Sequence, residues 1–187
     1  MAAYVRGDPA AFDRLFATLA PAVHGFFLRS FGNRALADDL LQITFLKIHR
    51  ARSSYQPTRP LRPWIFTIAA RVRLDELRRR YALPEDADEA RLAAAEEALA
   101  AQAVDTPGTD ALVEERDRGR VAEQVRAALA RLPESQRVVV HLHRYEELTF
   151  GEIAKVLGTT EGAVKLRAFR AYERLRTELA SLVEDGA

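Results

Sequence analysis

Residues 151–167 read GEIAKVLGTTEGAVKLR, a pattern typical of two short helices joined by a tight turn. Ala154 is small enough to lie where the helices cross, and Gly158 can adopt the left-handed conformation that the turn requires. Thr160 can cap the second helix, whose free backbone amides suit a phosphate oxygen. The small core would contain Ile153, Leu157 and Val164. The segment predicts a helix-turn-helix that fits the DNA major groove; the alternative is an αα-hairpin without a DNA role.

The second of these helices has an apolar face and a basic face at 100° per residue. The predicted core face contains Val164, Ala168, Ala171, Leu175 and Leu179. The predicted outward face contains Ala163, Leu166, Arg167, Arg170 and Arg174, with Lys165 at the boundary. Arginines on such a helix can reach phosphates or guanine, and an exposed Leu166 could contact a thymine methyl or a protein partner, or be a tolerated surface residue.

Helical signals extend over the rest of the chain. Asp8-Pro9 predicts a helix start, Pro21 a restart, and Gly32-Asn33 a break. Further helices are predicted over 35–50, 64–80, 110–132 and 134–146. No stretch alternates with the period of two that strands require. We therefore predict an all-α fold with two small helical domains, residues 1–80 and 110–187, joined by a linker at 81–109.

The net charge of +1 conceals three blocks of different charge. Residues 1–80 carry 14 Lys and Arg against 6 Asp and Glu, a net +8. Residues 81–118 carry 3 against 11, a net −8, and residues 119–187 carry 11 against 10, a net +1. The basic first block indicates a polyanionic partner. The net +1 of the last block predicts weak DNA binding by that block alone.

The helix at 35–50 is predicted to place Leu36, Leu40 and Ile43 inward. The opposite face would contain Asp38, Gln42, Phe45 and His49, with Asp39 alongside. Alternatively, this face has no function: it is exposed to solvent, and Phe45 packs against a neighbouring helix. Between Arg59 and Arg80 the chain has seven arginines, with Tyr55, Trp64 and Phe66 in or beside the stretch. Basic residues interleaved with aromatics suit a groove for single-stranded nucleic acid, although Trp64 and Phe66 can equally be core residues.

Several function classes are disfavoured. The chain has no cysteine, so it has no disulfide framework or thiolate metal site. His141 and His143, two apart on a helix, point in different directions, and we predict no metal or other cofactor. A Gly-rich phosphate loop and a nucleophile elbow are both missing, so we predict that the chain is not an enzyme. Without an apolar run of membrane-spanning length or a signal-type N-terminus, we predict a cytoplasmic protein that does not insert into membranes.

Three motifs together resemble the extracytoplasmic-function sigma factors of bacterial RNA polymerase, in the minimal form with sigma regions 2 and 4 only. They are DDLLQITFLKIHRAR at 38–52, RPWIFTIAARVRLDELRRR at 62–80, and ARLPESQRVVVHLHRYEELTFGEIAKVLGTTEGAVKLRAFRAYERLR at 130–176. Their order and spacing match across both predicted domains. The resemblance implies a stress-response type of transcription factor that directs polymerase to promoters.

The resemblance also implies roles for individual residues. The residues implied to bind the β′ clamp helices of core polymerase are Asp38, Asp39 and Gln42. Those implied to bind the −10 element and capture a flipped base are Tyr55, Arg59, Arg62, Arg71, Arg78 and Arg79. Those implied to bind the −35 duplex are Thr160, Glu161, Ala163, Lys165, Arg167 and Arg170. The implied partners are core polymerase (the β′ clamp helices and the β flap), promoter DNA and an anti-sigma factor.

The sequence departs from the family pattern at three of its positions. Arg71 replaces the usual Asn, and Ala163 and Leu166 replace the Thr and Ser of GTVKSR. The last two changes remove hydroxyl donors, which affects promoter choice more than family membership. The acidic linker could mimic RNA in a polymerase channel, act as a spacer, or pair with the basic domain. Two other functions stay open: a sigma mimic that sequesters anti-sigma factors, and a helix-turn-helix regulator that binds DNA as a dimer.

Overall fold

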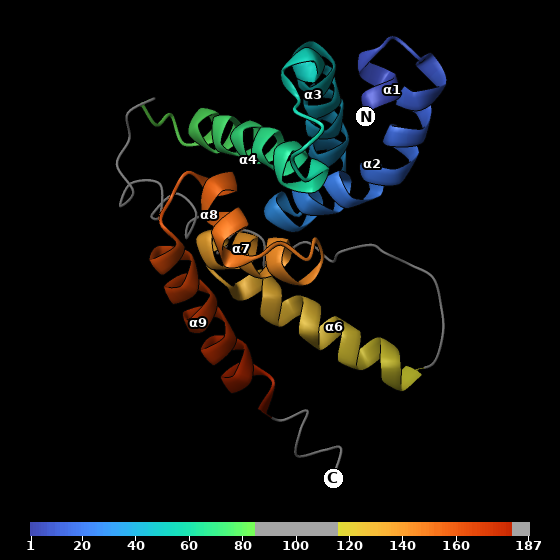
Figure 1. The fold of residues 1–187 in the computed structure, drawn as a ribbon. Coiled ribbons are helices and arrows are strands. Elements are labelled where there is room, and N and C mark those ends of the chain that lie inside the picture. The colour runs from blue at the N-terminus through green and yellow to red at the C-terminus, as the bar shows by residue number, and fades with distance from the viewer. Residues whose placement is uncertain (85–115, 181–187) are drawn as a thin grey trace.

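The computed structural model describes residues 1–84 and 116–180, and every regular element in these ranges is a helix, which confirms the predicted all-α class (Figure 1). The predicted linker lies almost wholly outside the described residues. The N-terminal half contains α1 (Ala2–Val5), α2 (Pro9–Phe31), α3 (Arg34–Ala51), the 3₁₀ turn η1 (Arg52–Ser54) and α4 (Leu61–Arg80). The C-terminal half contains α6 (Arg116–Arg131), α7 (Glu134–Arg144), α8 (Phe150–Leu157) and α9 (Glu161–Glu178).

Helix α2 begins and ends at the predicted signals. The Asp8 side chain caps it by accepting a hydrogen bond from the Ala11 amide, and Gly32 ends it at a φ of 64°. The predicted restart at Pro21 is wrong, because α2 continues through this residue. A proline removes one backbone hydrogen bond and strains a helix. Here the helix persists because neighbouring residues on both sides of the proline, including Leu19 and Val23, are buried.

Helix α3 buries Leu40 as predicted, but the assignments of Ile43 and Phe45 are wrong. Ile43, expected inside, is 43% exposed, whereas Phe45, expected on the opposite face, is 4% exposed. The Phe45 ring lies 4.7 Å from that of Phe16 and 6.3 Å from that of Phe12, measured between centroids. Both Ile43 and Phe45 are large and apolar, and the aromatic side chains of α2 decide which of them is buried.

The C-terminal half contains the predicted helix-turn-helix. Thr149 and Glu152 form a capping box at the start of α8, and Gly158 ends this helix at a φ of 67°. Thr160 caps α9 by accepting a hydrogen bond from the Ala163 amide at 3.2 Å. The predicted core side chains Ile153, Val164, Ala168 and Ala171 are buried, and Leu175 and Leu157 are half-buried.

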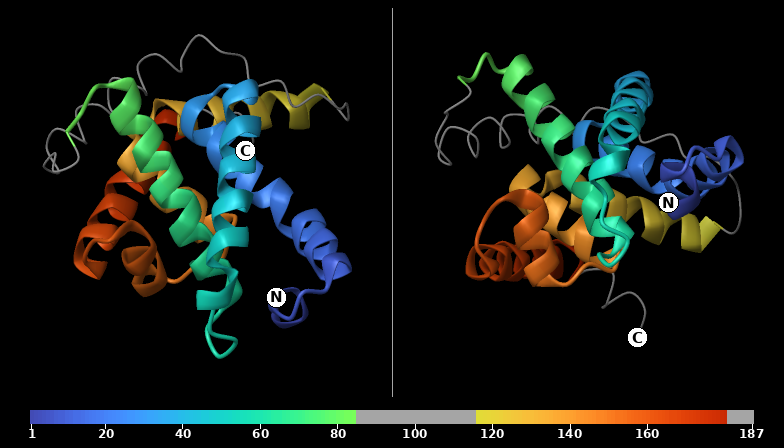
Figure 2. Two further views of the ribbon diagram at one scale, coloured as in Figure 1. Left: turned by 90° about the horizontal axis from the view of Figure 1, so that it is seen from above. Right: turned by 45° about the horizontal axis from the view of Figure 1, so that its top comes forward.

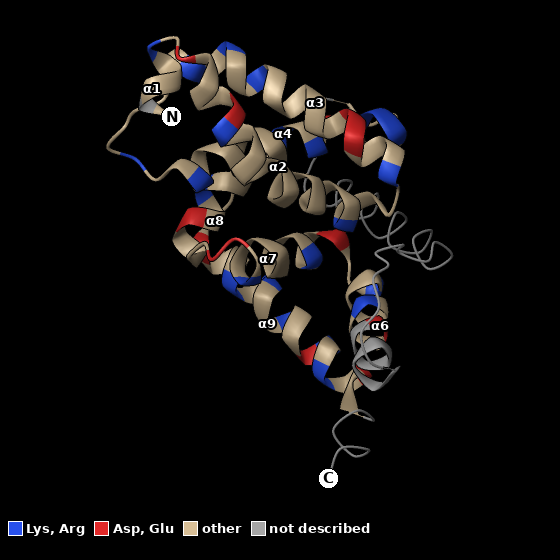
Figure 3. Cartoon of the chain, turned by 90° about the vertical axis from the view of Figure 1, so that its right-hand side faces the viewer, with Lys and Arg blue, Asp and Glu red and all other residues tan. Residues whose placement is uncertain are grey.

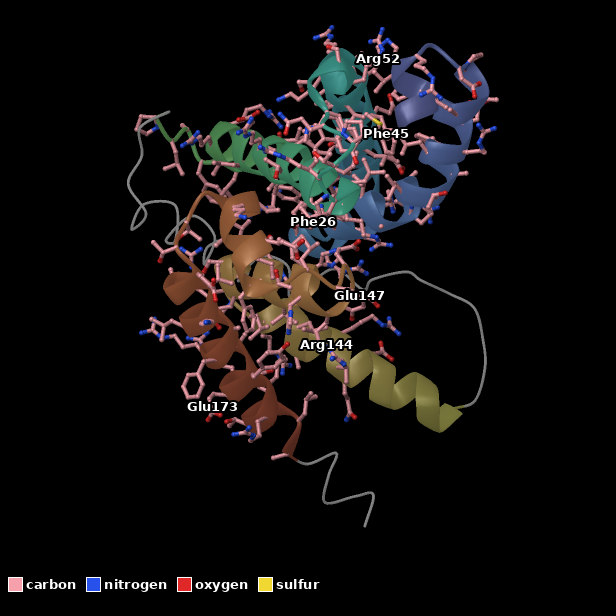
Figure 4. All side chains as sticks on the ribbon, in the orientation of Figure 1. Phe26, Phe45, Arg52, Arg144, Glu147 and Glu173 are labelled. Carbon is pink, nitrogen blue, oxygen red and sulfur yellow. The ribbon has the colours of Figure 1, made fainter. Side chains whose placement is uncertain are left out.

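The two halves pack directly against each other. Helix α8 lies beneath α4, and α7 lies against α2 (Figures 1 and 2). One cluster of buried apolar side chains runs through both halves, from Phe26 and Phe66 to Val139 and Leu142. Phe26 lies at this junction in Figure 4. Side chains of the N-terminal half therefore contact the helix-turn-helix half.

Candidate nucleic-acid interface

The predicted −35 residues all lie in the first three turns of α9 or at its cap. Glu161 and Lys165 form an ion pair with each other at 2.7 Å, one helical turn apart. Ala163 is half-buried, and Arg170 is exposed. The Thr160 hydroxyl caps α9 as an acceptor, so it orients the free amides of α9 and can still donate its own hydrogen.

Helix α9 exposes two large apolar side chains, and only one of them was predicted to be exposed. Phe169 is 63% exposed and Leu166 is 48% exposed. They lie opposite the buried residues Val164 and Ala168, on the side of α9 that faces away from the rest of the half. The sequence predicted that Leu166 is exposed but not Phe169, although at 100° per residue Phe169 lies beside Leu166 on the surface of the helix. Exposed large apolar side chains on a candidate recognition helix are suited to contact thymine methyl groups.

A cleft of about 600 Å³ lies between α4, α7, α8 and α9. Its described lining includes five cationic side chains and no carboxylate: Arg71, Arg73, Lys155, Arg167 and Arg170. Arg71 was predicted to bind the −10 element, and Arg167 and Arg170 the −35 element. The structure thus brings members of the two predicted DNA-binding sets to one cleft. Figure 3 shows that Lys and Arg are spread over helices of both halves rather than over one surface.

The other predicted −10 residues have varied surroundings. The Tyr55 hydroxyl donates a hydrogen bond to the Arg59 carbonyl at 2.8 Å, and its ring packs edge-on against Trp64 at 5.2 Å. Trp64 is half-buried and Phe66 is buried, so the core interpretation holds for Phe66. The Arg62 guanidinium pairs with the buried Glu146 of the C-terminal half at 2.9 Å.

The basic end of α4 contains an internal ion cluster. Arg79 donates two hydrogen bonds to Glu76, at 2.8 and 2.9 Å, and Arg80 donates one at 3.0 Å. Burial acts to raise the pKa of Glu76, but these hydrogen bonds and the charges of Arg79 and Arg80 outweigh it and lower the pKa. Glu76 therefore stays ionised and fixes the Arg79 guanidinium, while the half-buried Arg78 lies on the same turn.

The three predicted polymerase-binding residues are exposed on α3. Asp38 lies 3.1 Å from the His24 ring of α2, measured from Oδ1 to Nε2. Asp39 and Gln42 share their face of the helix with Ile43 and with Leu46, which is 50% exposed. The sequence analysis missed this apolar component because it assigned Ile43 to the core. A face that combines polar and exposed apolar groups is suited to bind a protein.

The junction of the two halves holds buried charged groups that belong to none of the motifs found in the sequence. Glu134, with no exposed surface, accepts hydrogen bonds from Arg73 at 3.2 Å and from Arg137 at 2.8 Å. His141, 3% exposed, accepts one from the Arg29 Nε at 2.7 Å through its Nδ1. Its Nε2 lies 3.4 Å from Glu146. The Glu134–Arg73 and Arg29–His141 contacts join one half to the other. The Glu134–Arg137 and His141–Glu146 pairs lie within the C-terminal half.

Comparison with known proteins identifies the family. Models of sigma-70 region 2 and sigma-70 region 4 match residues 15–82 and 122–175. The chain is 38% identical to the RNA polymerase sigma factor CarQ of Myxococcus xanthus, over 94% of this chain and 93% of that protein. The chain belongs to the sigma factor family of bacterial RNA polymerase.

Within this family it is an extracytoplasmic-function (ECF) sigma factor. It is 31% identical to the ECF RNA polymerase sigma factor RpoE of Cereibacter sphaeroides, over 92% of this chain and 88% of that one. Its fold resembles that of a sigma factor RpoE in a co-crystal structure with the anti-sigma factor NepR from Bartonella quintana, with a TM-score of 0.66 and 21% identity over 91% of this chain and 97% of that chain. The resemblance based on the three motifs is confirmed, and the protein directs RNA polymerase to promoters.

Neither a membrane-spanning helix nor a cluster of metal-binding side chains is found among the residues that the structure describes. None of the helices in the described ranges has the length and apolar character needed to cross a membrane. Within the same ranges, no three His, Asp or Glu side chains come together in a way that could hold a metal ion.

Proposed function

We propose that the ECF sigma factor divides promoter recognition between its halves: the start of α9 reads the −35 duplex, and the loop before α4, with α4 itself, binds the separated strands of the −10 element. The observation that carries this proposal is the capped helix α9. Its core side is packed against α8 through Val164, while Leu166, Phe169 and Arg170 are exposed. This is the geometry in which a recognition helix enters a major groove.

At the −35 element, Lys165, Arg167 and Arg170 supply positive charge, and Thr160 and Ala163 place the first turn of α9 against the DNA backbone. Glu161 is paired with Lys165 and can accept a hydrogen bond from a cytosine amino group. Leu166 stands where the family pattern has Ser and cannot donate a hydrogen bond. We propose that Leu166 and Phe169 instead contact thymine methyl groups, which favours a T-rich −35 sequence.

At the −10 element, Arg59, Arg62, Arg71, Arg78 and Arg79 contact backbone phosphates, and Tyr55 stacks with an unpaired base. Support comes from Tyr55 itself: it is half-buried, lies in the loop before α4, and its ring is held against Trp64. An edge-on contact with Trp64 restricts the tyrosine ring without covering both of its faces. Strand capture requires a flat side chain that is fixed in position yet accessible.

Asp38, Asp39 and Gln42 are proposed to bind the β′ clamp helices of core polymerase, and the C-terminal half to bind the β flap. The exposed Ile43 and Leu46 extend the α3 surface. The fold-related RpoE of known structure was crystallised with an anti-sigma factor, and we propose that an anti-sigma factor also regulates this chain. The protein is proposed to act in the cytoplasm and to catalyse no reaction of its own.

Run-off transcription with purified core polymerase on a genomic library tests the proposed function. Specific transcripts that require the added sigma factor are expected. The variant Asp39→Ala with Gln42→Ala should lose binding to core polymerase, while Asp13→Ala, which removes one exposed charge from another part of the same half, should retain it. A chain that binds core but starts no transcript would support the sigma-mimic alternative. DNA-dependent dimerisation without polymerase binding would support the regulator alternative.

A further inference from the structure

The cleft between α4, α7, α8 and α9 has the size of a small-molecule site. Its volume is about 600 Å³, within the range of about 300–1,000 Å³ that is usual for pockets that bind ligands and cofactors. A cleft of this volume admits a small molecule and excludes a DNA duplex, whose major groove is wide enough to hold a whole α-helix. Its lining therefore indicates which small molecule it suits.

Three exposed cationic side chains line this cleft, each from a different helix. They are Arg71 of α4, Lys155 of α8 and Arg170 of α9. None of the three forms an ion pair with a residue that the structure describes, and the described lining contains no carboxylate. Like charges that share a cleft repel one another, so an anion bound between them lowers the electrostatic energy. The charges of the lining favour a ligand with several negative charges.

The remainder of the lining is largely apolar. Ala70, Val138 and Val156 line the cleft and are buried, and Leu74 and Leu157 line it and are half-buried. An inorganic anion gains nothing from such a surface, whereas an apolar or aromatic group is stabilised when it leaves water. The lining thus favours an anion that also contains a flat, weakly polar group.

Gln136 adds a polar group whose oxygen has no donor. Its side chain lines the same cleft and is 8% exposed, and its Oε1 accepts no hydrogen bond within the described part of the chain. A buried oxygen without a donor is costly, and most buried polar atoms in folded proteins have a partner. A side-chain amide can accept a hydrogen bond from the amino group of a nucleobase and donate one to the ring nitrogen beside it. Gln136 is suited to bind the edge of a base.

We propose that this cleft binds a nucleotide with two or more phosphates. Arg71, Lys155 and Arg170 bind the phosphates, the apolar side chains pack against the base, and Gln136 binds the edge of the base. Arginine binds phosphate through paired hydrogen bonds, and lysine binds it as a point charge. Because the described lining contains no carboxylate, it offers no side-chain ligand of the kind that Mg²⁺ prefers, and the site takes the metal-free nucleotide.

Nucleotide binding itself does not depend on the proposed function, but one consequence does. Arg71 and Arg170 are also proposed to bind promoter DNA, so a bound nucleotide would compete with DNA for them. Lys155 and Gln136 belong to neither proposed set of DNA-binding residues. Variants of these two residues therefore separate the nucleotide site from the DNA-binding surface.

Isothermal titration calorimetry of the full-length protein tests the site, without polymerase, DNA or Mg²⁺. The ligands are ATP, GTP, adenosine and inorganic triphosphate. ATP or GTP should bind about tenfold more tightly than adenosine or triphosphate, since only the whole nucleotide contacts both the cations and the apolar side chains. Addition of Mg²⁺ should weaken binding, because the metal neutralises phosphate charge. Equal affinity for ATP, GTP and triphosphate would show a general attraction for anions and overturn the proposal, as would the absence of binding.

Two variants locate the site. Lys155→Gln should weaken binding of the preferred nucleotide about tenfold. Lys47→Gln is the matched control and should change it less than about twofold, because Lys47 is an exposed lysine of α3 outside the cleft. Gln136→Leu should weaken binding of the nucleotide and leave binding of triphosphate unchanged, a difference that a loss of folding would not produce. Equal weakening in Lys155→Gln and Lys47→Gln would overturn the proposal.

Competition with a short generic DNA duplex at fixed ionic strength separates this proposal from the proposed function. The preferred nucleotide should displace DNA from the wild-type protein. Lys155→Gln should bind DNA within about twofold of wild type and need about tenfold more nucleotide for the same displacement. Nucleotide binding without displacement would refute the assignment of Arg71 and Arg170 to DNA and leave the nucleotide site supported. Equal displacement from the wild-type protein and from Lys155→Gln would overturn the nucleotide site.

Discussion

Replacement of Glu134 by alanine should cause the largest loss of stability among the acidic residues of the described chain. The carboxylate is fully buried and accepts hydrogen bonds from Arg73 and Arg137, with an additional 2.6 Å contact between its Oε2 and the Arg137 Nη2. Arg73 and Arg137 are 5% and 4% exposed. Truncation would leave two buried guanidinium groups without this carboxylate. Loss of one partner from a buried ion pair costs about 3–5 kcal/mol, so we expect a decrease of that size in the free energy of unfolding.

Urea unfolding followed by far-ultraviolet circular dichroism measures this change. Glu173→Ala is the matched control, because Glu173 is an exposed acid that pairs with Arg176 at 2.6 Å within α9 (Figure 4). Surface pairs of this kind contribute about 0.2–1 kcal/mol. A double-mutant cycle with Arg73→Ala isolates the part of the energy that joins the two halves, which should exceed about 1 kcal/mol. A loss below about 1 kcal/mol for Glu134→Ala would show that the cluster is not formed in solution.

Three further predictions concern the interfaces. Asp39→Ala with Gln42→Ala should weaken binding to core polymerase about tenfold or more while leaving the urea midpoint unchanged, since both side chains are exposed; pull-down and unfolding measurements check this. Phe169→Ala should reduce transcription from T-rich −35 promoters by about tenfold and leave stability within about 0.5 kcal/mol, because the ring is 63% exposed; run-off assays on matched promoters check this. Burial, followed by the charge of Arg29, lowers the pKa of His141 below its usual value of about 6.5 and outweighs the opposing effect of Glu146. The folded protein therefore binds fewer protons at His141 than the unfolded chain, so this residue should lower the stability as the pH falls below about 6.5, by up to about 1.4 kcal/mol per pH unit; urea unfolding of the natural chain and of His141→Gln across a pH series checks this, and parallel profiles would contradict it.

Local signals were sufficient to predict the helix-turn-helix. The turn depends on Gly158, the cap on Thr160, and the core side of α9 on a simple apolar repeat around Val164; each of these acts within one or two helical turns. The basic and aromatic side chains before and within α4 were also predicted to be near one another from sequence proximity alone. Their roles in binding DNA stay predictions, because they depend on a partner.

The predictions that were wrong depend on contacts between residues far apart in the sequence. The periodicity of α3 gives two apolar edges, containing Ile43 and Phe45, and only the side chains of α2 select between them. Pro21 is a helix breaker by local rules, yet burial of its neighbours keeps α2 continuous. The ion pairs at the junction join residues separated by 61 to 84 positions, and the Arg29–His141 hydrogen bond joins residues 112 positions apart. No local pattern distinguishes such charged residues from those on an ordinary solvated surface.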